Sequence, residues 1–195
     1  MVFAIMRETT WVTALAKAAS RVGASRFWAA LALAMMLGHG AAMAQSPEAT
    51  GRVSGLPVPR FVSLKADKVN VRSGPTKDHQ VAWVFTRAGL PVEITAEFET
   101  WRRIRDSEGA EGWVYHSMLS GRRTALVGPW LKKDGPVALY SGRSGEAAVK
   151  ARIEPGVLGS VKDCDGSWCR FFGDGFDGFV EQVKLWGVYP NEKFE

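Results

Sequence analysis

The stretch Val69-Asn70-Val71-Arg72-Ser73-Gly74-Pro75, followed later by Gly112-Trp113-Val114, decides how this 195-residue chain folds, because a second version of both follows. The second version begins at Val137-Ala138-Leu139-Tyr140-Ser141-Gly142 and ends at Gly178-Phe179-Val180. Between these ends, three residues of each copy match at nearly the same spacing: Gly89 with Gly156, Trp101 with Trp168, and Ile104 with Phe171. Recurrence at a fixed spacing indicates an internal repeat. The chain is therefore predicted to contain two copies of one small module.

Both copies consist of short strand patterns separated by turn residues. The predicted strands are 68–71, 81–86, 90–98, 101–106 and 111–116 in the first copy, and 137–140, 149–153, 157–164, 168–172 and 176–181 in the second. No segment after residue 44 has a sustained helical period. The predicted fold class is all-β, with two tandem small barrels at residues 61–127 and 132–190. Since a module of about 60 residues buries little surface alone, packing of one copy on the other would stabilise both.

The first 44 residues have the three-part order of a secretory signal peptide. Four basic residues precede an apolar run from Phe27 to Leu37, and Ala42-Met43-Ala44 supplies small residues at a cleavage site. The apolar run is shorter than the about 20 residues of a membrane span, so cleavage is favoured over the alternative of an uncleaved anchor. Residues 45–60 are rich in Ser, Pro and Gly and are predicted to be a flexible leader. We expect a periplasmic or secreted protein, without stable membrane insertion after cleavage.

Export also changes the charge of the protein. Removing residues 1–44 leaves 21 basic and 19 acidic side chains, a net charge of +2 in place of +5. Neither copy then has the concentrated positive charge that nucleic-acid binding requires. Nucleic acid is excluded as an expected partner.

Both cysteines lie in the second copy, in Cys164-Asp165-Gly166-Ser167-Trp168-Cys169. Asp, Gly and Ser are strong turn formers, and an oxidising compartment favours a disulfide across the resulting hairpin. A zinc site is the alternative, but no histidine or further cysteine lies nearby in the sequence to complete four ligands. We predict a Cys164 to Cys169 disulfide, no metal and no cofactor.

Residues 69–75, Gly89, Trp101 with Ile104, and Gly112-Trp113-Val114 together resemble the bacterial Src homology 3 (SH3) domain. The first copy is similar over its full length, and the whole is similar to exported, tandem SH3-like proteins of Gram-negative bacteria. The resemblance implies a partly open barrel of five or six strands and a binding role towards cell-wall peptides or partner proteins. The second copy departs from the pattern at three positions: Tyr140 stands in place of Arg72, Arg143 of Pro75, and Phe179 of Trp113.

The alternation of strand residues suggests a ligand-binding face on the first copy. If Ile104 and Val114 face the core, then Trp101, Arg103 and Arg105 share the opposite face, as do Trp113 and Tyr115. Aromatic rings offer contact area and arginine binds carboxylates, so the predicted ligand-binding residues are Trp101, Arg103, Trp113 and Tyr115. The alternative is that these rings cover the barrel or the contact between the copies.

The motif loop, Asn70, Arg72, Ser73 and Gly74, is a second candidate. Asn and Ser bond to local backbone and Gly permits unusual dihedral angles, so this motif is expected to shape a loop more than to contact a ligand.

No catalytic site is predicted. His79 and His116, the histidines that remain after cleavage, have no nucleophile and acidic orienting residue at suitable spacing. Glu93, Glu97 and Glu99 alternate along one strand and are expected to form a solvated edge instead of an acid and base pair. The sequence thus predicts a non-catalytic binding protein for a cell-wall peptide. The alternative is a structural or adaptor protein that binds another envelope protein.

Overall fold

The computed structural model describes residues 49–195. The predicted signal peptide and the first residues of the leader lie outside this range. Strands dominate the described residues, and the longest helix among them is a five-residue 3-10 turn, η2 (Pro129–Lys133). No helix in this range is long and apolar enough to cross a membrane. The predicted all-β class is confirmed.

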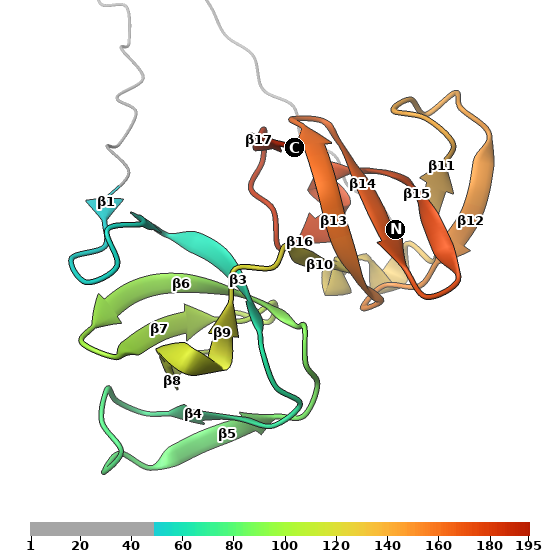
Figure 1. Ribbon diagram of the computed structural model, residues 1–195. Coiled ribbons are helices and arrows are strands. Elements are labelled where there is room, and N and C mark those ends of the chain that lie inside the picture. The colour runs from blue at the N-terminus through green and yellow to red at the C-terminus, as the bar shows by residue number, and fades with distance from the viewer. Residues whose placement is uncertain (1–48) are drawn as a thin grey trace, which may run out of the picture. The chain divides into compact units, whose positions relative to one another are not determined.

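The first copy forms one antiparallel sheet of seven strands in the order β5-β4-β8-β7-β6-β3-β9 (Figure 1). The predicted strands are present within one or two residues at their ends. The bounds are β3 (Arg60–Leu64), β4 (Val69–Arg72), β5 (Val81–Phe85), β6 (Pro91–Phe98), β7 (Trp101–Arg105), β8 (Glu111–Tyr115) and β9 (Leu119–Ser120), with the 3-10 turn η1 (His116–Met118) between β8 and β9.

The second copy repeats this arrangement in the order β12-β11-β15-β14-β13-β10-β16, with β17 also paired to β13. Strands at the same place in the two sheets correspond: β4 to β11, β6 to β13, β7 to β14, and β8 to β15. The bounds are β10 (Thr124–Val127), β11 (Val137–Tyr140), β12 (Val149–Ile153), β13 (Leu158–Asp165), β14 (Trp168–Gly173), β15 (Phe176–Glu181), η3 (Gln182–Lys184), β16 (Leu185–Trp186) and β17 (Lys193–Phe194).

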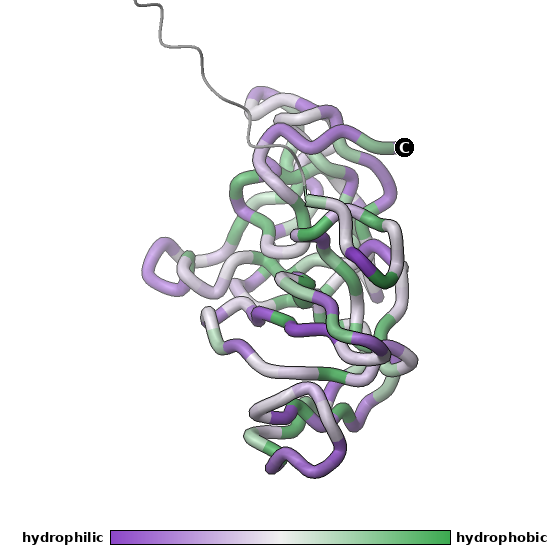
Figure 2. The backbone as a smooth tube through the Cα atoms, turned by 90° about the vertical axis from the view of Figure 1, so that its left-hand side faces the viewer, coloured by the Kyte–Doolittle hydropathy of each residue, from purple (hydrophilic) through white to green (hydrophobic). Residues whose placement is uncertain are grey.

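Each copy has its own hydrophobic core, built by residues that alternate along the strands. Hydrophobic and hydrophilic residues alternate along much of the traced backbone (Figure 2). In β4, Val69 and Val71 are fully buried whereas Asn70 between them is exposed. The first core contains Leu64, Val69, Val71, Val92, Ile94, Ile104 and Val114, and the second is centred on Leu139, Cys169, Phe171 and Val180.

The repeated glycines have specific backbone roles. Gly89 and Gly156 have φ angles of 77° and 87°, a conformation that favours glycine at a turn. At Gly112 a Cβ atom would lie 2.5 Å from Cγ1 of Val71, and at Gly178 it would lie 2.9 Å from a backbone oxygen of β11. Close approach of β8 to β4, and of β15 to β11, therefore requires glycine.

The two copies pack against each other through an aromatic cluster. The ring of Phe61 in β3 lies 5.0 Å from that of Trp186 and 4.7 Å from that of Tyr189, between ring centroids. The Tyr189 hydroxyl donates a 2.8 Å hydrogen bond to Glu93 in β6, whose carboxylate also accepts from Arg105. Burial raises the pKa of Tyr189, and the bond to the Glu93 carboxylate raises it further. The contact between copies that the small size of each module favours is thus present.

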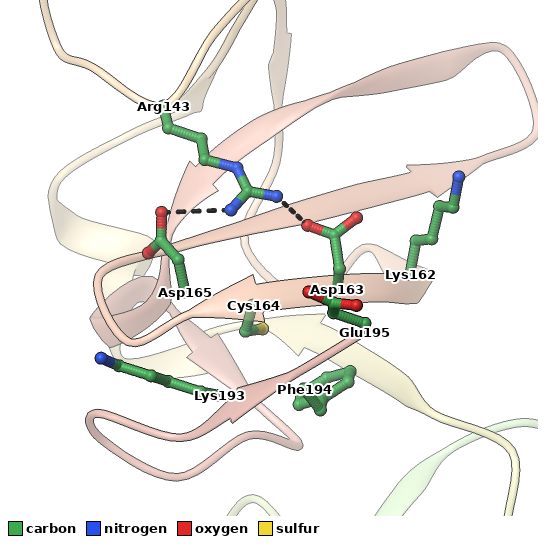
Figure 3. A pocket seen from close by; sticks show the side chains of 8 residues that line it. All are labelled: Arg143, Lys162, Asp163, Cys164, Asp165, Lys193, Phe194 and Glu195. Carbon is green, nitrogen blue, oxygen red and sulfur yellow. Dashed lines mark hydrogen bonds and ion pairs between the residues drawn. The ribbon is translucent and has the colours of Figure 1, made fainter.

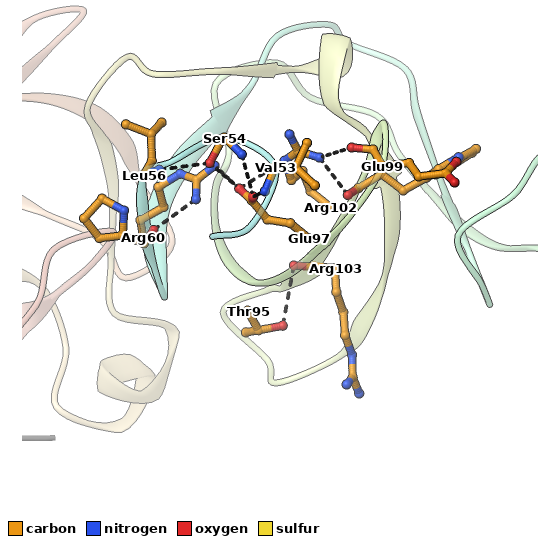
Figure 4. Close-up of polar contacts among 11 residues, drawn as sticks. Val53, Ser54, Leu56, Arg60, Thr95, Glu97, Glu99, Arg102 and Arg103 are labelled. Carbon is orange, nitrogen blue, oxygen red and sulfur yellow. Dashed lines mark hydrogen bonds and ion pairs between the residues drawn. The ribbon is translucent and has the colours of Figure 1, made fainter. Parts of the chain in front are cut away.

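A short hairpin precedes the first copy, inside the segment that the sequence assigns to a leader. Strand β1 (Ala49–Thr50) pairs with β2 (Pro57–Val58), and the turn between them binds Glu97. Glu97 accepts hydrogen bonds from the backbone N–H (2.9 Å) and hydroxyl (2.6 Å) of Ser54 and from Arg60 (2.8 Å), as Figure 4 shows. The composition of this segment did not predict this order, because the partner carboxylate lies about 40 residues further along the chain.

The predicted solvated edge of carboxylates is wrong for Glu93 and Glu97. Strand β6 lies between β3 and β7, so it is not an edge strand. Glu93 is 2% exposed and the side chain of Glu97 is 1% exposed, whereas Glu99 lies in an exposed turn. Burial raises the pKa of Glu97, but the bonds from Ser54 and from Arg60 outweigh it and lower the pKa to about 2.

Candidate functional site

A pocket of about 210 Å³ opens on the first copy where β4, β7 and β8 approach the β4–β5 loop. Strand β4 contributes Asn70 and Arg72, whose side chains share the face opposite Val69 and Val71. The pocket is lined by Lys68, Asn70, Arg72, Lys77, Trp101, Tyr115 and Met118. Four of the eight predicted ligand-binding and motif-loop residues meet here: Trp101, Tyr115, Asn70 and Arg72.

One wall of the pocket is aromatic. Trp101 at the start of β7 and Tyr115 at the end of β8 are directly opposite each other, and their rings meet edge to face at 5.5 Å and 81°. The ring of His116 also contacts that of Tyr115, at 5.0 Å between ring centroids. Trp101 is only 7% exposed, and the ring of Tyr115 packs against it. The half-buried Tyr115 offers the more accessible aromatic surface.

The other wall is cationic. Lys68, Arg72 and Lys77 line the pocket, and no carboxylate does. Within residues 49–195, none of these three side chains forms an ion pair. The Arg72 guanidinium donates to the carbonyl of His79 at 2.6 Å, which holds it beside the β4–β5 loop.

The motif loop divides into two parts. Asn70 and Arg72 line the pocket, whereas Ser73 and Gly74 shape the loop, as the sequence suggested. The Ser73 N–H donates to Gln80 across the loop at 3.1 Å. The His79 ring packs over Gly74, where a Cβ atom would lie 2.3 Å from its Nε2 atom.

Two predicted ligand-binding residues lie outside the pocket. Arg103 forms an ion pair with Glu111 on β8, so its charge is neutralised locally. Trp113 is half-buried and lies across from Arg103 on the neighbouring strand. Arg105, on the same face of β7, is paired with the buried Glu93. Of the four predicted residues, Trp101 and Tyr115 come together in one pocket.

Sequence reasoning missed Lys68, Lys77 and Met118. Lys68 could have been found, because it precedes Val69 and continues the alternation of Asn70 and Arg72. Lys77 and Met118 lie in a loop and a 3-10 turn, where period-two alternation carries no information.

The second copy keeps the tryptophan but changes its surroundings. Trp168 meets Tyr140 edge to face at 5.5 Å and 89°, and Tyr140 occupies the position of Arg72. Pro136 and Ala138 stand where the first copy has Lys68 and Asn70. The cationic wall is therefore absent from the corresponding strand β11.

A larger pocket of about 690 Å³ lies elsewhere on the second copy, along β13 and β17. Figure 3 shows Arg143 reaching from its loop to Asp163 and Asp165, two residues of β13 whose side chains flank Cys164. Backbone N–H groups of Trp168 and Ser167 lower the pKa of Asp165, and Arg143 lowers it further. This pocket carries both charge signs, and its arginine is already paired.

The predicted disulfide is confirmed: Cys164 and Cys169 are bonded and lie directly opposite each other on β13 and β14. Within the described range no group of three or more His, Cys, Asp or Glu side chains is arranged to hold a metal ion.

The sequence profile described as "Bacterial SH3 domain" matches residues 65–121 and again residues 133–187. The chain belongs to the bacterial SH3 domain family. The repeat predicted two tandem copies of one module, and the resemblance of their motifs predicted the SH3 family; both predictions are confirmed. Bacterial SH3 domains are generally binding modules of the cell envelope.

Two solved structures are similar to this SH3 protein, at 14% identity each. NlpC2 from Trichomonas vaginalis has a TM-score of 0.30 and matches 66% of this chain and 48% of its own. NlpC1 from the same organism has a TM-score of 0.30 and matches 70% of this chain and 48% of its own. The chain thus spans about half the length of these structures, and so weak a likeness carries no argument about function. No curated protein matches the sequence at a significant level.

Proposed function

We propose that the protein is an exported, non-catalytic binding module that recognises cell-wall peptides through its first SH3 domain. The observation that carries this proposal is the pocket in which the aromatic pair Trp101 and Tyr115 faces Asn70 and Arg72. Concave sites with aromatic walls and a few polar groups suit small ligands and peptides. The proposal assigns residues 1–44 to a signal peptide, 45–60 to a leader, the first SH3 domain to binding and the second to support. The boundary expected at residue 127 moves forward, because β10 (Thr124–Val127) pairs with β13 and β16 of the second domain.

The two aromatic pairs provide a matched test. Tyr115→Ala removes the accessible ring from the pocket. Tyr140→Ala removes the ring that meets Trp168 edge to face at the same 5.5 Å separation, from the strand position that Arg72 has in the first domain. Residues 45–195 of each variant are incubated with purified peptidoglycan sacculi and sedimented. We expect Tyr115→Ala to weaken binding about tenfold or more, as loss of a central aromatic contact does, and Tyr140→Ala to bind as the wild type does.

If both variants sediment with sacculi as much as the wild type does, the pocket is not the binding site. If the wild-type protein is absent from the sacculus pellet, its ligand is not a cell-wall peptide. Both variants are first compared with the wild type by thermal unfolding, because each loses an aromatic pair contributing about 1 kcal/mol.

A structural or adaptor role with an envelope protein is the second candidate. A pocket of about 310 Å³ lies beside the contact between the domains, lined largely by apolar residues. At its rim Trp130 is 51% exposed and Val183 is 68% exposed. Exposed apolar residues that gather at one site are typical of protein interfaces. Crosslinking in intact cells should then recover one dominant protein, and recovery of wall fragments alone would count against this candidate.

A further inference from the structure

We infer that the first SH3 domain binds a free carboxylate of an acidic peptide, held by Lys68, Arg72 and Lys77. This inference rests on the proposed function for the source of the ligand, the cell wall, but the ligand chemistry is argued from the pocket itself. It assigns recognition of the ligand's carboxylate to these three residues instead of to Arg103, which the sequence analysis had named.

The first step is the charge balance of the pocket. Three cationic side chains line a volume of about 210 Å³ without an acidic one. Four other arginines of this domain have acidic partners: Arg60 and Arg102 contact Glu97, Arg103 contacts Glu111, and Arg105 contacts Glu93. Like charges brought close together repel one another, and an anion that enters between them relieves the repulsion. The pocket is thus complementary to an anion.

The second step concerns the geometry available to that anion. Arg72 is half-buried, and its Nη1 atom is occupied by the His79 carbonyl at 2.6 Å. This bond fixes the guanidinium while its other N–H groups stay available, and a fixed planar donor suits carboxylate recognition. The exposed lysines, Lys68 and Lys77, add flexible donors from the strand end and from the loop.

The third step distinguishes a peptide carboxylate from a bare ion. The cations share the pocket with Trp101, Tyr115 and Met118, which present aromatic carbon and a thioether. These groups gain from contact with carbon surface next to the charge. An acidic peptide supplies a carboxylate and an apolar backbone within one short segment, whereas inorganic phosphate supplies the charge alone.

The second SH3 domain supports the inference by contrast. Its corresponding strand positions carry Pro136, Ala138 and Tyr140, none of them cationic. Arg143, the cation in the loop that follows β11, is already bound by Asp163 and Asp165. Carboxylate binding is therefore assigned to the first domain alone.

The test compares native sacculi with sacculi whose carboxylates have been converted to amides by carbodiimide and ammonia. The probe proteins are the wild type, the triple variant Lys68→Gln, Arg72→Gln, Lys77→Gln, and a control triple variant Arg87→Gln, Lys132→Gln, Lys133→Gln. The control residues are exposed, form no ion pair within residues 49–195 and do not line the pocket. Each triple variant replaces three cations by glutamine, so both variants lose the same net charge. Thermal unfolding checks that all three proteins are folded.

We expect wild-type and control proteins to bind native sacculi about tenfold or more tightly than amidated sacculi, because a charge-assisted hydrogen bond is about twice as strong as a neutral one. The pocket triple variant should bind both preparations equally weakly. If the wild type binds both preparations equally well, the carboxylate inference is overturned while cell-wall binding stands. If the control variant loses binding as the pocket variant does, the effect is one of net charge, and the inference is again overturned.

A small-molecule titration keeps the inference testable if sacculi are not bound at all. The indole N–H signal of Trp101 is followed by NMR during addition of N-acetyl-alanyl-alanine, of its C-terminal amide, and of inorganic phosphate. A saturable shift with the free acid alone supports carboxylate recognition even though the wall would then not be the source. No shift with the acid, or an equal shift with phosphate or with the amide, rejects it.

Discussion

The two SH3 domains join the same pair of neighbouring strands by different chemistry. In the first domain, Glu97 on β6 lies opposite Arg102 on β7, and their side chains form an ion pair at 3.4 Å. In the second domain, Cys164 on β13 lies opposite Cys169 on β14, and the two are joined by a disulfide. All four side chains are almost completely buried. A cross-link at one structural position is thus ionic in one copy and covalent in the other.

The repeat establishes that these positions correspond. Arg102 directly follows Trp101, and Cys169 directly follows Trp168. Each link also lies where a terminal segment joins the sheet. The hairpin that precedes the first domain binds Glu97, and β17 at the end of the chain pairs with Cys164. The two domains should therefore fail under different conditions, the first in acid and the second in reductant.

The largest expected effect comes from Glu97→Gln. This change leaves Arg60 and Arg102, whose side chains are 17% and 9% exposed, without their buried counter-charge. Removing one partner of a buried ion pair destabilises by about 3 kcal/mol, measured by urea denaturation. The control is Glu99→Gln, in an exposed turn two residues further, which should change stability by less than about 0.5 kcal/mol. Equal stability of the two variants would show that Glu97 does not hold the sheet and hairpin together.

Acid should reproduce the effect of that substitution in the wild type. The pKa of Glu97 is 4.5 in the unfolded reference and about 2 in the folded protein. Within this window the unfolded chain binds the proton and the folded one does not, so stability rises with pH. The contribution of Glu97 is fully present above pH 4.5 and lost as pH falls towards 2. The stability difference between wild type and Glu97→Gln should shrink to nearly zero across this window, and a constant difference would contradict the prediction.

Reductant should act on the second domain by a smaller amount. The disulfide closes a short loop, for which the chain-entropy estimate is about 2 kcal/mol. Hydrogen exchange should become faster at the core residues Phe171 and Val180 after reduction, while Ile104 in the first core keeps its rate. The variant in which both cysteines are alanine should show no further response to reductant. Equal acceleration in both cores would mean that the domains unfold as one unit.

Strands such as β4, whose residues alternate between core and solvent, could be predicted from the sequence, whereas β10 and β3 were missed, each for its own reason. Strand β10 has all four residues buried, so no period-two pattern marks it. Thr124 in this strand bonds to Ser63 and to the Gly89 carbonyl of the first domain, at 2.7 Å in both cases. One face of β10 is therefore buried against the first domain. Strand β3 was missed beside the Pro-containing leader, although Phe61 is central to the contact between domains.

The candidate site was predicted in part, for a related reason. The repeated motif singled out Asn70 and Arg72, and strand alternation singled out Trp101 and Tyr115. Neither pattern could reveal which arginines are neutralised, because that depends on the register of neighbouring strands. Arg105 lies opposite Glu93, and this pairing is visible only once β6 and β7 are aligned.

The smallest expected effect concerns the loops at Pro75 and Arg143, where the two domains also differ. Within residues 49–195 the first-domain loop forms no ion pair, and it is held by the hydrogen bond from Arg72 to the His79 carbonyl and by the packing of His79 over Gly74. The second-domain loop is tied to β13 by Arg143, whose ion pairs with Asp163 and Asp165 are partly exposed. Exposed ion pairs contribute about 0.5 kcal/mol and are screened by salt.

Arg143→Gln should therefore lower global stability by less than about 1 kcal/mol, yet speed hydrogen exchange in residues 141–148. High salt should speed exchange in this loop of the wild type and leave residues 73–80 of the first domain unchanged. The control is Arg152→Gln, an exposed position on β12 without an ion pair in residues 49–195, which should alter neither loop. If salt acts equally on both loops, Arg143 is not what orders the second one, and the difference between the domains is confined to the strand cross-link and the pocket.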